Sequence, residues 1–271
     1  MADTAAPSDS ARALPHLGSY VRNLPVSLER MFENAIDWEH LPHLHADSFK
    51  AISCRDAGDW GWHCDAVLPN DETIELELRL DREHQRWITR TLSGIGEGTE
   101  IWTYVFARPE GGIRVVVDFF MPDISAEARE QMLAYYRQLY AGLYDEDEEM
   151  MTGRQSALEA KPSKADEITL GMVSEVKTKL PLRFELGGKH YRLIEDEGEL
   201  IAHAALCPHM LGPLDGSDVI GGAVRCPWHG YEFDIRTGVE RGGRACRLAT
   251  SPLIDIDDSG QLIATLTRPV E

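Results

Sequence analysis

Two short loops in the C-terminal half of the chain each place one cysteine beside one histidine. The first reads Cys207-Pro-His209, and the second, after sixteen intervening residues, reads Cys226-Pro-Trp-His229. Zinc fingers also use two cysteines and two histidines, but they group cysteine with cysteine and histidine with histidine. A loop that offers one thiolate and one imidazole suits a two-iron cluster, because each loop can then give one ligand to each iron. The spacing predicts a metal centre of this kind, with structural zinc as the alternative.

The segments around these four residues, CPHMLGPL and CPWHGYEFDIRTG, closely resemble the two cluster-binding loops of Rieske proteins. The resemblance implies a [2Fe–2S] cluster held by Cys207, His209, Cys226 and His229. It covers most of residues 168–269, where short strand-like runs with dense Gly and Pro predict a small all-β domain. The loops lack the additional cysteines of the respiratory Rieske proteins, so the chain resembles the oxygenase and ferredoxin branch.

A second group of metal-binding residue types lies near the N-terminus. Asp37, His40 and His45 form the pattern D-x-x-H-x-x-x-x-H. Asp37 and His40 are three residues apart and are expected to share one face of a helix. Pro42 is expected to break that helix, so that His45 can turn back toward the same point. Two imidazoles with a carboxylate form the facial triad of non-haem Fe(II) oxygenases, which predicts a mononuclear iron site.

With Glu33 and Asn34 in front of it, this stretch closely resembles the E-N-x-x-D-x-x-H-x-x-x-x-H motif of Rieske non-haem iron oxygenases. The resemblance implies that His40 and His45 bind iron and that Asn34 lies near it. It also implies that Asp37 bridges a cluster histidine to an iron histidine, across two subunits of a ring-shaped homotrimer.

Two alternatives stay open for these histidines. They could form a histidine-rich helix end that interacts with the helix C-terminus and holds no metal. His43 is a competing ligand, and it ranks below His45 because it shares a face with His40 only if the helix runs through Pro42.

The resemblance implies that the carboxylate ligand comes from a long C-terminal helix, after a Glu-Asp pair. Glu146-Asp147 fits that context, so Asp147 is the predicted ligand and Asp145 the first substitute. The alternative is that this acidic run is only a solvated helix face.

The periodicity of apolar residues predicts an α+β unit followed by an all-β unit. Between about 47 and 121, runs such as Ile74, Leu76, Leu78 and Leu80 alternate with charged residues, which predicts an antiparallel meander. A sheet with a long C-terminal helix would form a START-like helix-grip fold with an internal cavity.

The predicted organisation is a disordered leader over 1–18, a helix-grip catalytic domain over 19–158, a linker over 159–167 and a Rieske domain over 168–271. Within the helix-grip domain we expect a helix over 19–40 that Ser19 caps, and a long helix from Ser125 through about Leu158. Aromatic candidates for the cavity lining, with core packing as the alternative, are Trp60, Trp62, Trp87, Trp102, Phe106 and Phe119.

Composition limits the partners and the compartment. The net charge of −19 disfavours nucleic acid and anionic membrane surfaces, and no apolar run is long enough to cross a bilayer. Five cysteines are an odd and low number for a disulfide scaffold, so a reducing, cytoplasmic environment is expected. Cys54, Cys64 and Cys246 are expected to be core residues.

Together these features predict a Rieske-type oxygenase component that hydroxylates or demethylates a small apolar or aromatic substrate with O2. The resemblance implies that an external NAD(P)H-dependent reductase or ferredoxin supplies the electrons. The order of the two domains is the reverse of the order in that family, and the catalytic part is short. The alternative is a Rieske electron carrier or redox sensor fused to an iron-free START-like ligand-binding module.

Overall fold

The computed structural model describes residues 14–122, 125–161 and 165–266. Its contacts divide the chain into two compact units, Met1–Gln155 and Ser156–Glu271. Each unit is described by itself below. Most of the predicted leader lies outside the described residues, but residues 16–18 belong to the first strand and are not part of a leader.

Unit 1 is built on one seven-stranded antiparallel sheet in the order β1-β7-β6-β5-β4-β3-β2. Six of the strands form the predicted meander, and β1 adds to it by pairing with β7. The strands are β1 (His16–Leu24), β2 (Ala51–Gly58), β3 (Gly61–Val67), β4 (Thr73–Asp81), β5 (Arg86–Ser93), β6 (Glu100–Ala107) and β7 (Ile113–Phe120).

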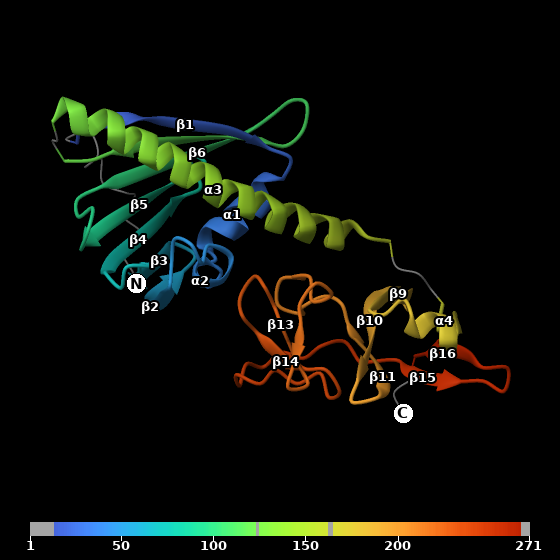
Figure 1. Cartoon of the computed structure of the whole chain (residues 1–271). Helices are drawn as coiled ribbons and strands as arrows, with labels where there is room; N and C mark the ends of the chain where they lie inside the picture. Colours follow the sequence, from blue (N-terminus) through green and yellow to red (C-terminus); the bar gives the residue numbers. More distant parts are fainter. Residues whose placement is uncertain (1–13, 123–124, 162–164, 267–271) are drawn as a thin grey trace. The chain divides into compact units, whose positions relative to one another are not determined.

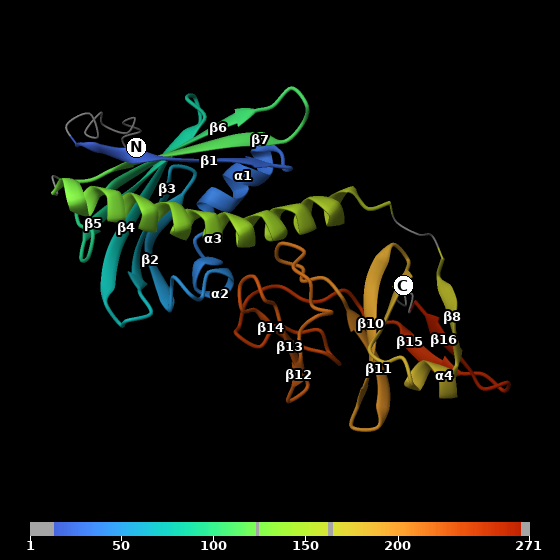
Figure 2. The same ribbon diagram turned by 45° about the horizontal axis from the view of Figure 1, so that its top comes forward.

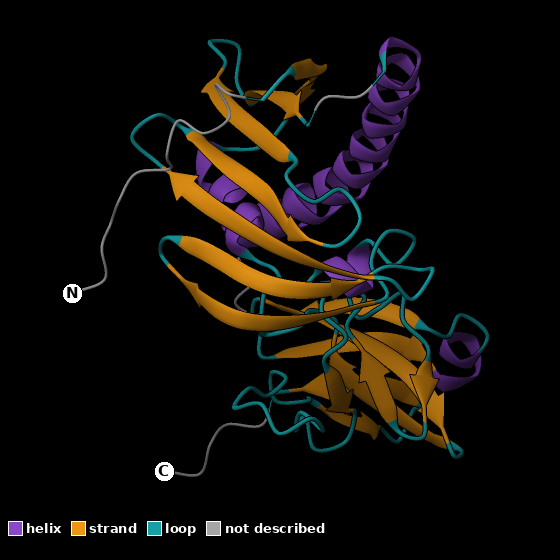
Figure 3. Ribbon diagram, turned by 90° about the vertical axis from the view of Figure 1, so that its left-hand side faces the viewer, coloured by secondary structure: helices purple, strands orange, loops and turns teal. Residues whose placement is uncertain are grey.

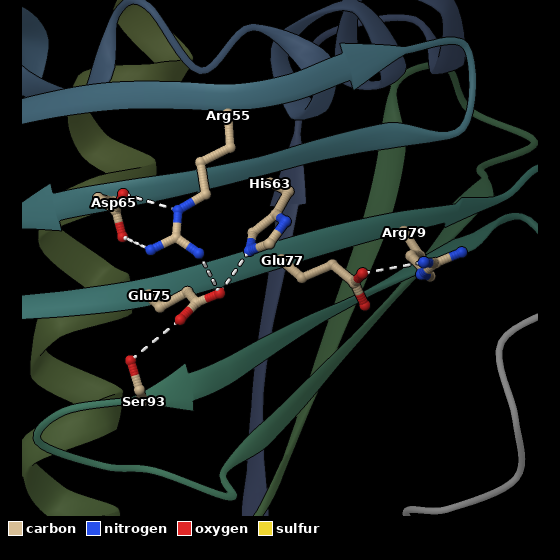
Figure 4. A network of polar contacts seen from close by, with 7 residues as sticks. All are labelled: Arg55, His63, Asp65, Glu75, Glu77, Arg79 and Ser93. Atoms are coloured by element: carbon tan, nitrogen blue, oxygen red, sulfur yellow. Dashed lines mark hydrogen bonds and ion pairs between the residues drawn. The ribbon is translucent and has the colours of Figure 1, made fainter.

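The predicted alternation in β4 separates the two faces of this sheet. Ile74, Leu76 and Leu78 are buried in the main core of the unit. Their neighbours Glu75 and Glu77 lie on the opposite face, where Glu75 binds His63 of the adjacent strand β3 and Arg55 of the next strand β2 at 2.7 Å each (Figure 4). These polar contacts occupy this part of the sheet face that points away from the helices, and the main apolar core lies on the other face.

The described part of unit 1 contains the helices α1 (Leu28–Ile36), α2 (Leu41–Leu44) and most of the long α3 (Ala126–Glu159), whose last residues pass into unit 2. α3 crosses one face of the curved sheet (Figures 1 and 2). Only four of its residues are buried, namely Tyr144, Asp147, Met150 and Met151. The helix-grip arrangement predicted from the sequence is therefore confirmed for this unit, and one of the buried helix residues is a carboxylate.

The predicted helix over residues 19–40 is wrong in its first half. Residues up to Leu24 extend β1 and pair with β7, so Ser19 does not cap a helix. Pro25 has no N–H to continue the ladder and stops the strand. The true N-cap is Ser27, whose Oγ accepts a hydrogen bond from the Arg30 N–H, and the helix ends before Asp37.

Gly61, the first residue of β3, is the tightest backbone approach in unit 1. Its φ is +130°, and a Cβ there would lie 1.9 Å from the Leu78 carbonyl oxygen. We expect Gly61→Ala to destabilise unit 1 by about 3 kcal/mol, through the clash and the strained backbone. Gly142→Ala is the matched control, because Gly142 lies in α3 with open space around it, and the change should stabilise by about 0.5–1 kcal/mol. Urea unfolding followed by tryptophan fluorescence measures both, and equal stability of the two variants would contradict the prediction.

Unit 2 consists of three small antiparallel sheets in the described residues, with orders β11-β10-β9, β12-β13-β14 and β15-β16-β8. One short helix, α4 (Val173–Lys177), interrupts the strands (Figure 3). The strands are β8 (Glu167–Met172), β9 (Leu182–Leu186), β10 (Lys189–Asp196), β11 (Glu199–Ala204), β12 (Val219–Ile220), β13 (Ala223–Arg225), β14 (Glu232–Asp234), β15 (Leu253–Ile256) and β16 (Gln261–Thr265). The predicted all-β class is confirmed.

Among the residues that the structure describes, no helix has both the length and the apolar character needed to cross a membrane.

Candidate functional site: a buried His/His/Asp group and two Cys/His loops

A buried carboxylate on α3 marks the site in unit 1. Asp147 is only 8% exposed, and it lies on the helix stripe that also buries Tyr144 and Met151. Its acidic neighbour Asp145 is on the outer side, 70% exposed and paired with Arg22 at 2.6 Å. Asp147 and Asp145 therefore point to different sides of α3. Only part of the acidic run is exposed to solvent, and Asp147 is the buried one of the two predicted candidates.

Two buried histidines face Asp147 from the ends of α2. His40 precedes the first residue of α2, and His45 follows its last residue. The expected geometry of this segment is wrong in two respects. Asp37 ends α1 while His40 begins α2, so the two do not share a helix face, and Pro42 lies inside the first turn of α2 without breaking it. Proline is tolerated at that position because the first N–H groups of a helix have no partner within the helix.

The three side chains converge on one point. His45 Nε2 lies 3.1 Å and His40 Nε2 3.6 Å from Asp147 Oδ1. The two imidazole rings are 5.1 Å apart at 74°. One ligand atom from each residue lies within 4.8 Å of the others, and all three residues are buried. His43 is not part of this group.

The charges of the group stabilise one another. Burial alone would raise the pKa of Asp147, but a hydrogen bond from His45 and the neighbouring His40 ring lower it below its usual range. Burial alone would lower the pKa of His45, and Asp147 and Glu146 raise it above the usual value. Asp147 and His45 therefore stabilise each other's charged forms in a buried position, and shifted pKa values of this kind cluster at functional sites.

Carboxylates also approach the other ring nitrogen of each histidine. Glu146 Oε2 lies 2.6 Å from His45 Nδ1, and Asp37 Oδ2 lies 3.5 Å from His40 Nδ1. Such contacts orient imidazoles whose Nε2 atoms bind a metal. The sequence analysis assigned no role to Glu146, although it stands directly before the predicted ligand.

Asn34 fixes the carboxylate itself. Its Nδ2 donates to Asp147 Oδ1 at 2.9 Å, and both side chains are buried. Two turns further along α3, Arg154 donates from Nε and Nη2 to the two carboxylate oxygens of Glu33 at 2.7 and 2.6 Å. These contacts join α1 to α3, so the motif residues Glu33 and Asn34 hold the Asp147 segment in place.

A cavity of about 140 Å³ opens beside the His/His/Asp group. Apolar side chains from α1, α3 and the sheet supply most of its wall, including Met31, Leu76, Leu78, Trp62 and Trp87. Of the aromatic candidates, only Trp62 and Trp87 line it. Trp102 packs with Ile88 in a separate cluster, and Phe106 is 46% exposed.

In unit 2, the two Cys/His loops share one backbone design. Cys207 N–H donates to Gly212 O, and Leu211 N–H donates back to Cys207 O. In the second loop, Cys226 N–H donates to Tyr231 O, and Gly230 N–H donates back to Cys226 O. Leu211 and Gly230 each lie four residues after the cysteine of their loop, and both have a left-handed backbone conformation, with φ of +63° and +69°. The two loops therefore present their cysteines in equivalent ways.

The four side chains fit a [2Fe–2S] cluster. Cys207 and Cys226 are buried, and the His209 and His229 rings lie 4.4 Å apart. The hydrogen bond from Cys207 lowers the pKa of Cys226 to about 5, against the effect of burial and with a contribution from His229. A Cβ on Gly212 would lie 2.8 Å from Cys226 Sγ, so only glycine leaves that sulfur room. Two sulfurs and two imidazoles at one point are the donor set of a Rieske cluster.

The other three cysteines are free thiols away from this donor set. Cys64 is fully buried and faces Cys54 across β2 and β3, and both pack in the main core of unit 1. Cys246 is half-buried, less than expected for a core residue.

Comparison with known proteins supports this description of unit 2. Residues 166–252 match the family model of the Rieske [2Fe-2S] domain. Apoptosis-inducing factor 3 is 38% identical over 77 residues in Mus musculus and 31% identical over 121 residues in Homo sapiens. These matches cover 28% and 43% of this chain. The chain spans only 13% and 19% of the length of those relatives.

Solved structures resemble each unit separately. An aromatase/cyclase, Zhui from Streptomyces sp. R1128, covers 55% of this chain and 99% of its own length, with 13% identity and a TM-score of 0.46. The ferredoxin of carbazole 1,9a-dioxygenase from Nocardioides aromaticivorans IC177 covers 38% of this chain and 100% of its own length, with 19% identity and a TM-score of 0.33. The family match identifies residues 166–252 as a Rieske [2Fe–2S] domain. The seven-stranded sheet with its long helix makes the preceding unit a helix-grip domain, and this unit contains the buried His/His/Asp group.

Proposed function

We propose that the chain is a Rieske-type oxygenase component that hydroxylates or demethylates a small apolar or aromatic molecule with O2. The observation that carries the proposal is the buried group of His40, His45 and Asp147 beside an apolar cavity, in a chain that also contains a Rieske domain. In a monooxygenation, one atom of O2 enters the product and the other leaves as water, with two electrons and two protons consumed. An external NAD(P)H-dependent reductase or ferredoxin is the proposed electron donor.

The donor set suits a mononuclear ferrous ion. His40 and His45 would bind it through Nε2, and Asp147 would complete a facial triad with open positions. When bound, such an ion supplies the binding and activation of O2, and the Rieske cluster supplies single electrons. The chain's own contribution is to orient the imidazoles through Glu146 and Asp37, and to fix Asp147 through Asn34.

The cavity limits the size and charge of the substrate. Its volume of about 140 Å³ is close to that of an apolar cavity of about 150 Å³ that accommodates benzene in another protein. Among the residues that the structure describes, no lysine or arginine side chain lines the cavity, so a carboxylate substrate would find no cationic side chain of that kind there. We therefore propose a compact, uncharged substrate with about one ring.

The direct test uses the reduced protein, a panel of single-ring compounds and ¹⁸O-labelled O2. The proposal requires a product that carries label from O2 and is absent when the cluster is not reduced. The number of labelled atoms also distinguishes monooxygenation from dioxygenation. Tight binding of such compounds without any product would instead support an iron-free ligand-binding module.

The homotrimer that the resemblance implies is also part of this proposal. Determination of the molecular mass in solution tests it.

Glu146 provides a prediction specific to this geometry. We expect Glu146→Gln to weaken Fe(II) binding at the mononuclear site about 10- to 100-fold, because His45 Nδ1 loses its carboxylate partner. Titration of the iron-depleted site with Fe(II) or Co(II) measures the affinity. Glu149→Gln is the matched control, since Glu149 lies three residues further along α3 and is exposed. If both variants bind metal as the wild type does, Glu146 has no role in the site.

A further inference from the structure

Two flat side-chain groups, those of Tyr231 and Arg244, stack in a column on His209, one of the predicted cluster histidines. The ring of Tyr231 stacks on the His209 ring, with centroids 4.6 Å apart and an angle of 12° between the planes. The guanidinium carbon of Arg244 lies 4.0 Å from the centroid of the same tyrosine ring. At these distances the two groups can occupy only opposite faces of Tyr231. The order is therefore guanidinium, phenol, imidazole.

A buried carboxylate holds the arginine in this position. Glu240 Oε2 accepts the backbone N–H of Arg244 at 2.8 Å, and Glu240 Oε1 lies 3.8 Å from Arg244 Nη1. The Glu240 side chain is 1% exposed, whereas the Arg244 side chain is 46% exposed. Gly242 leaves room for this arrangement, because a Cβ there would lie 2.9 Å from Glu240 Oε1.

The column lies on the exposed side of the Cys/His loops. His209 is exposed, whereas His229 is buried. Nearby Arg241 differs from Arg244, because the Arg241 guanidinium hydrogen-bonds to Asp234 at 2.9 Å, whereas Arg244 Nη1 lies 3.8 Å from its carboxylate partner Glu240. Among the charged side chains that the structure describes on this loop, Arg244 is the one seated on the aromatic ring that touches a cluster histidine.

We propose that Arg244, seated on Tyr231, is a positioning residue that raises the reduction potential of the Rieske cluster. Reduction adds one negative charge to the cluster, and a fixed positive charge nearby favours the reduced form. The stack with Tyr231 holds the guanidinium near the cluster histidine, although the Arg244 side chain is partly exposed to water. Glu240 acts in the opposite direction, since its buried negative charge disfavours the reduced form. This inference concerns unit 2 alone and does not depend on the mononuclear iron.

Potentiometric titration of the full chain tests the proposal, with the cluster followed by visible absorption and by the electron paramagnetic resonance of the reduced form. We expect Arg244→Gln to lower the ratio of reduced to oxidised cluster at a given potential by about threefold to tenfold, a tenfold change being about 59 mV. Glu240→Gln should change the ratio in the opposite direction, because the glutamine oxygen still accepts the Arg244 N–H. Arg244→Lys, which keeps the charge, should restore most of the wild-type potential.

Arg241→Gln is the matched control. It removes one positive charge from the same loop, but not from Tyr231, and should leave the potential nearly unchanged. The shift caused by Arg244→Gln should also shrink at high salt, because the arginine is partly exposed. Iron and sulfide contents equal to the wild type show that each variant still holds its cluster. Unchanged potentials in both Arg244→Gln and Glu240→Gln, or shifts of the same sign in the two, would overturn the proposal.

Discussion

Asp147→Asn is expected to remove one iron from each chain and to leave the Rieske cluster in place. The proposed wild type holds about three irons, two in the cluster and one in unit 1. His40 Nε2 and His45 Nε2 both face Asp147 Oδ1, and a neutral amide at that point cannot replace the charge that a divalent cation needs. We expect affinity for Fe(II) to fall by more than about 100-fold, and product formation to fall to background. Iron and acid-labile sulfide analysis measures the loss.

Asp145→Asn is the control for this variant. Asp145 lies two residues away in the same acidic run, but it points outward and pairs with Arg22. This variant should keep all the iron. The cluster spectrum and the near-ultraviolet circular dichroism show whether Asp147→Asn remains folded. A wild-type protein with about two irons, which Asp147→Asn and His40→Ala/His45→Ala both leave unchanged, would reject the mononuclear site. The chain would then be a Rieske electron carrier or redox sensor with an iron-free ligand-binding unit.

The sequence predicted the sheet well and the first helix badly, and both outcomes have a physical reason. In β4, apolar and charged residues alternate along the strand, and the apolar residues are the more buried ones over most of its length. The two-residue period in the sequence therefore matches the burial in the structure. In β1, half-buried residues follow one another because α3 covers part of one face, and the alternation is lost. Val21, Leu24 and Leu28 then happen to match helical spacing. Only the pairing of β1 with β7, nearly one hundred residues away in sequence, resolves the ambiguity.

The parts of the candidate site that depend on residues close in sequence could be predicted. The parts that depend on how the helices pack against each other could not. The spacing of Asp37, His40 and His45, together with the resemblance to the oxygenase motif, indicated His40 and His45. The stripe of Tyr144, Asp147 and Met151 separates Asp147 from Asp145 once the helix phase is considered. The contact between Glu146 and His45 joins residues 101 positions apart. It depends on the register of α3 against α2, which tertiary packing sets. No local pattern reports such a register, so this partner appears only in the structure.

Cys226→Ser is expected to remove both irons and both sulfides of the cluster and to leave about one iron in each chain. A serine hydroxyl stays protonated near neutral pH and is a poor ligand for a two-iron cluster. The thiol that it replaces has its pKa lowered to about 5 by Cys207, with His229 contributing, so the site is built to present a thiolate. The visible colour and the electron paramagnetic resonance signal of the reduced cluster should both disappear. Turnover with any external reductase should stop as well.

Cys246→Ser is the control, because Cys246 lies in the same unit but outside both Cys/His loops. This variant should keep the full iron and sulfide content. Loss of the cluster in Cys246→Ser with retention in Cys226→Ser would contradict the assignment of the loops. Since the two irons of the cluster and the proposed iron of unit 1 would be held by different compact units, the losses should be independent. The double variant Asp147→Asn/Cys226→Ser should then contain almost no iron, and one iron remaining in it would mean that a further metal site exists in the chain.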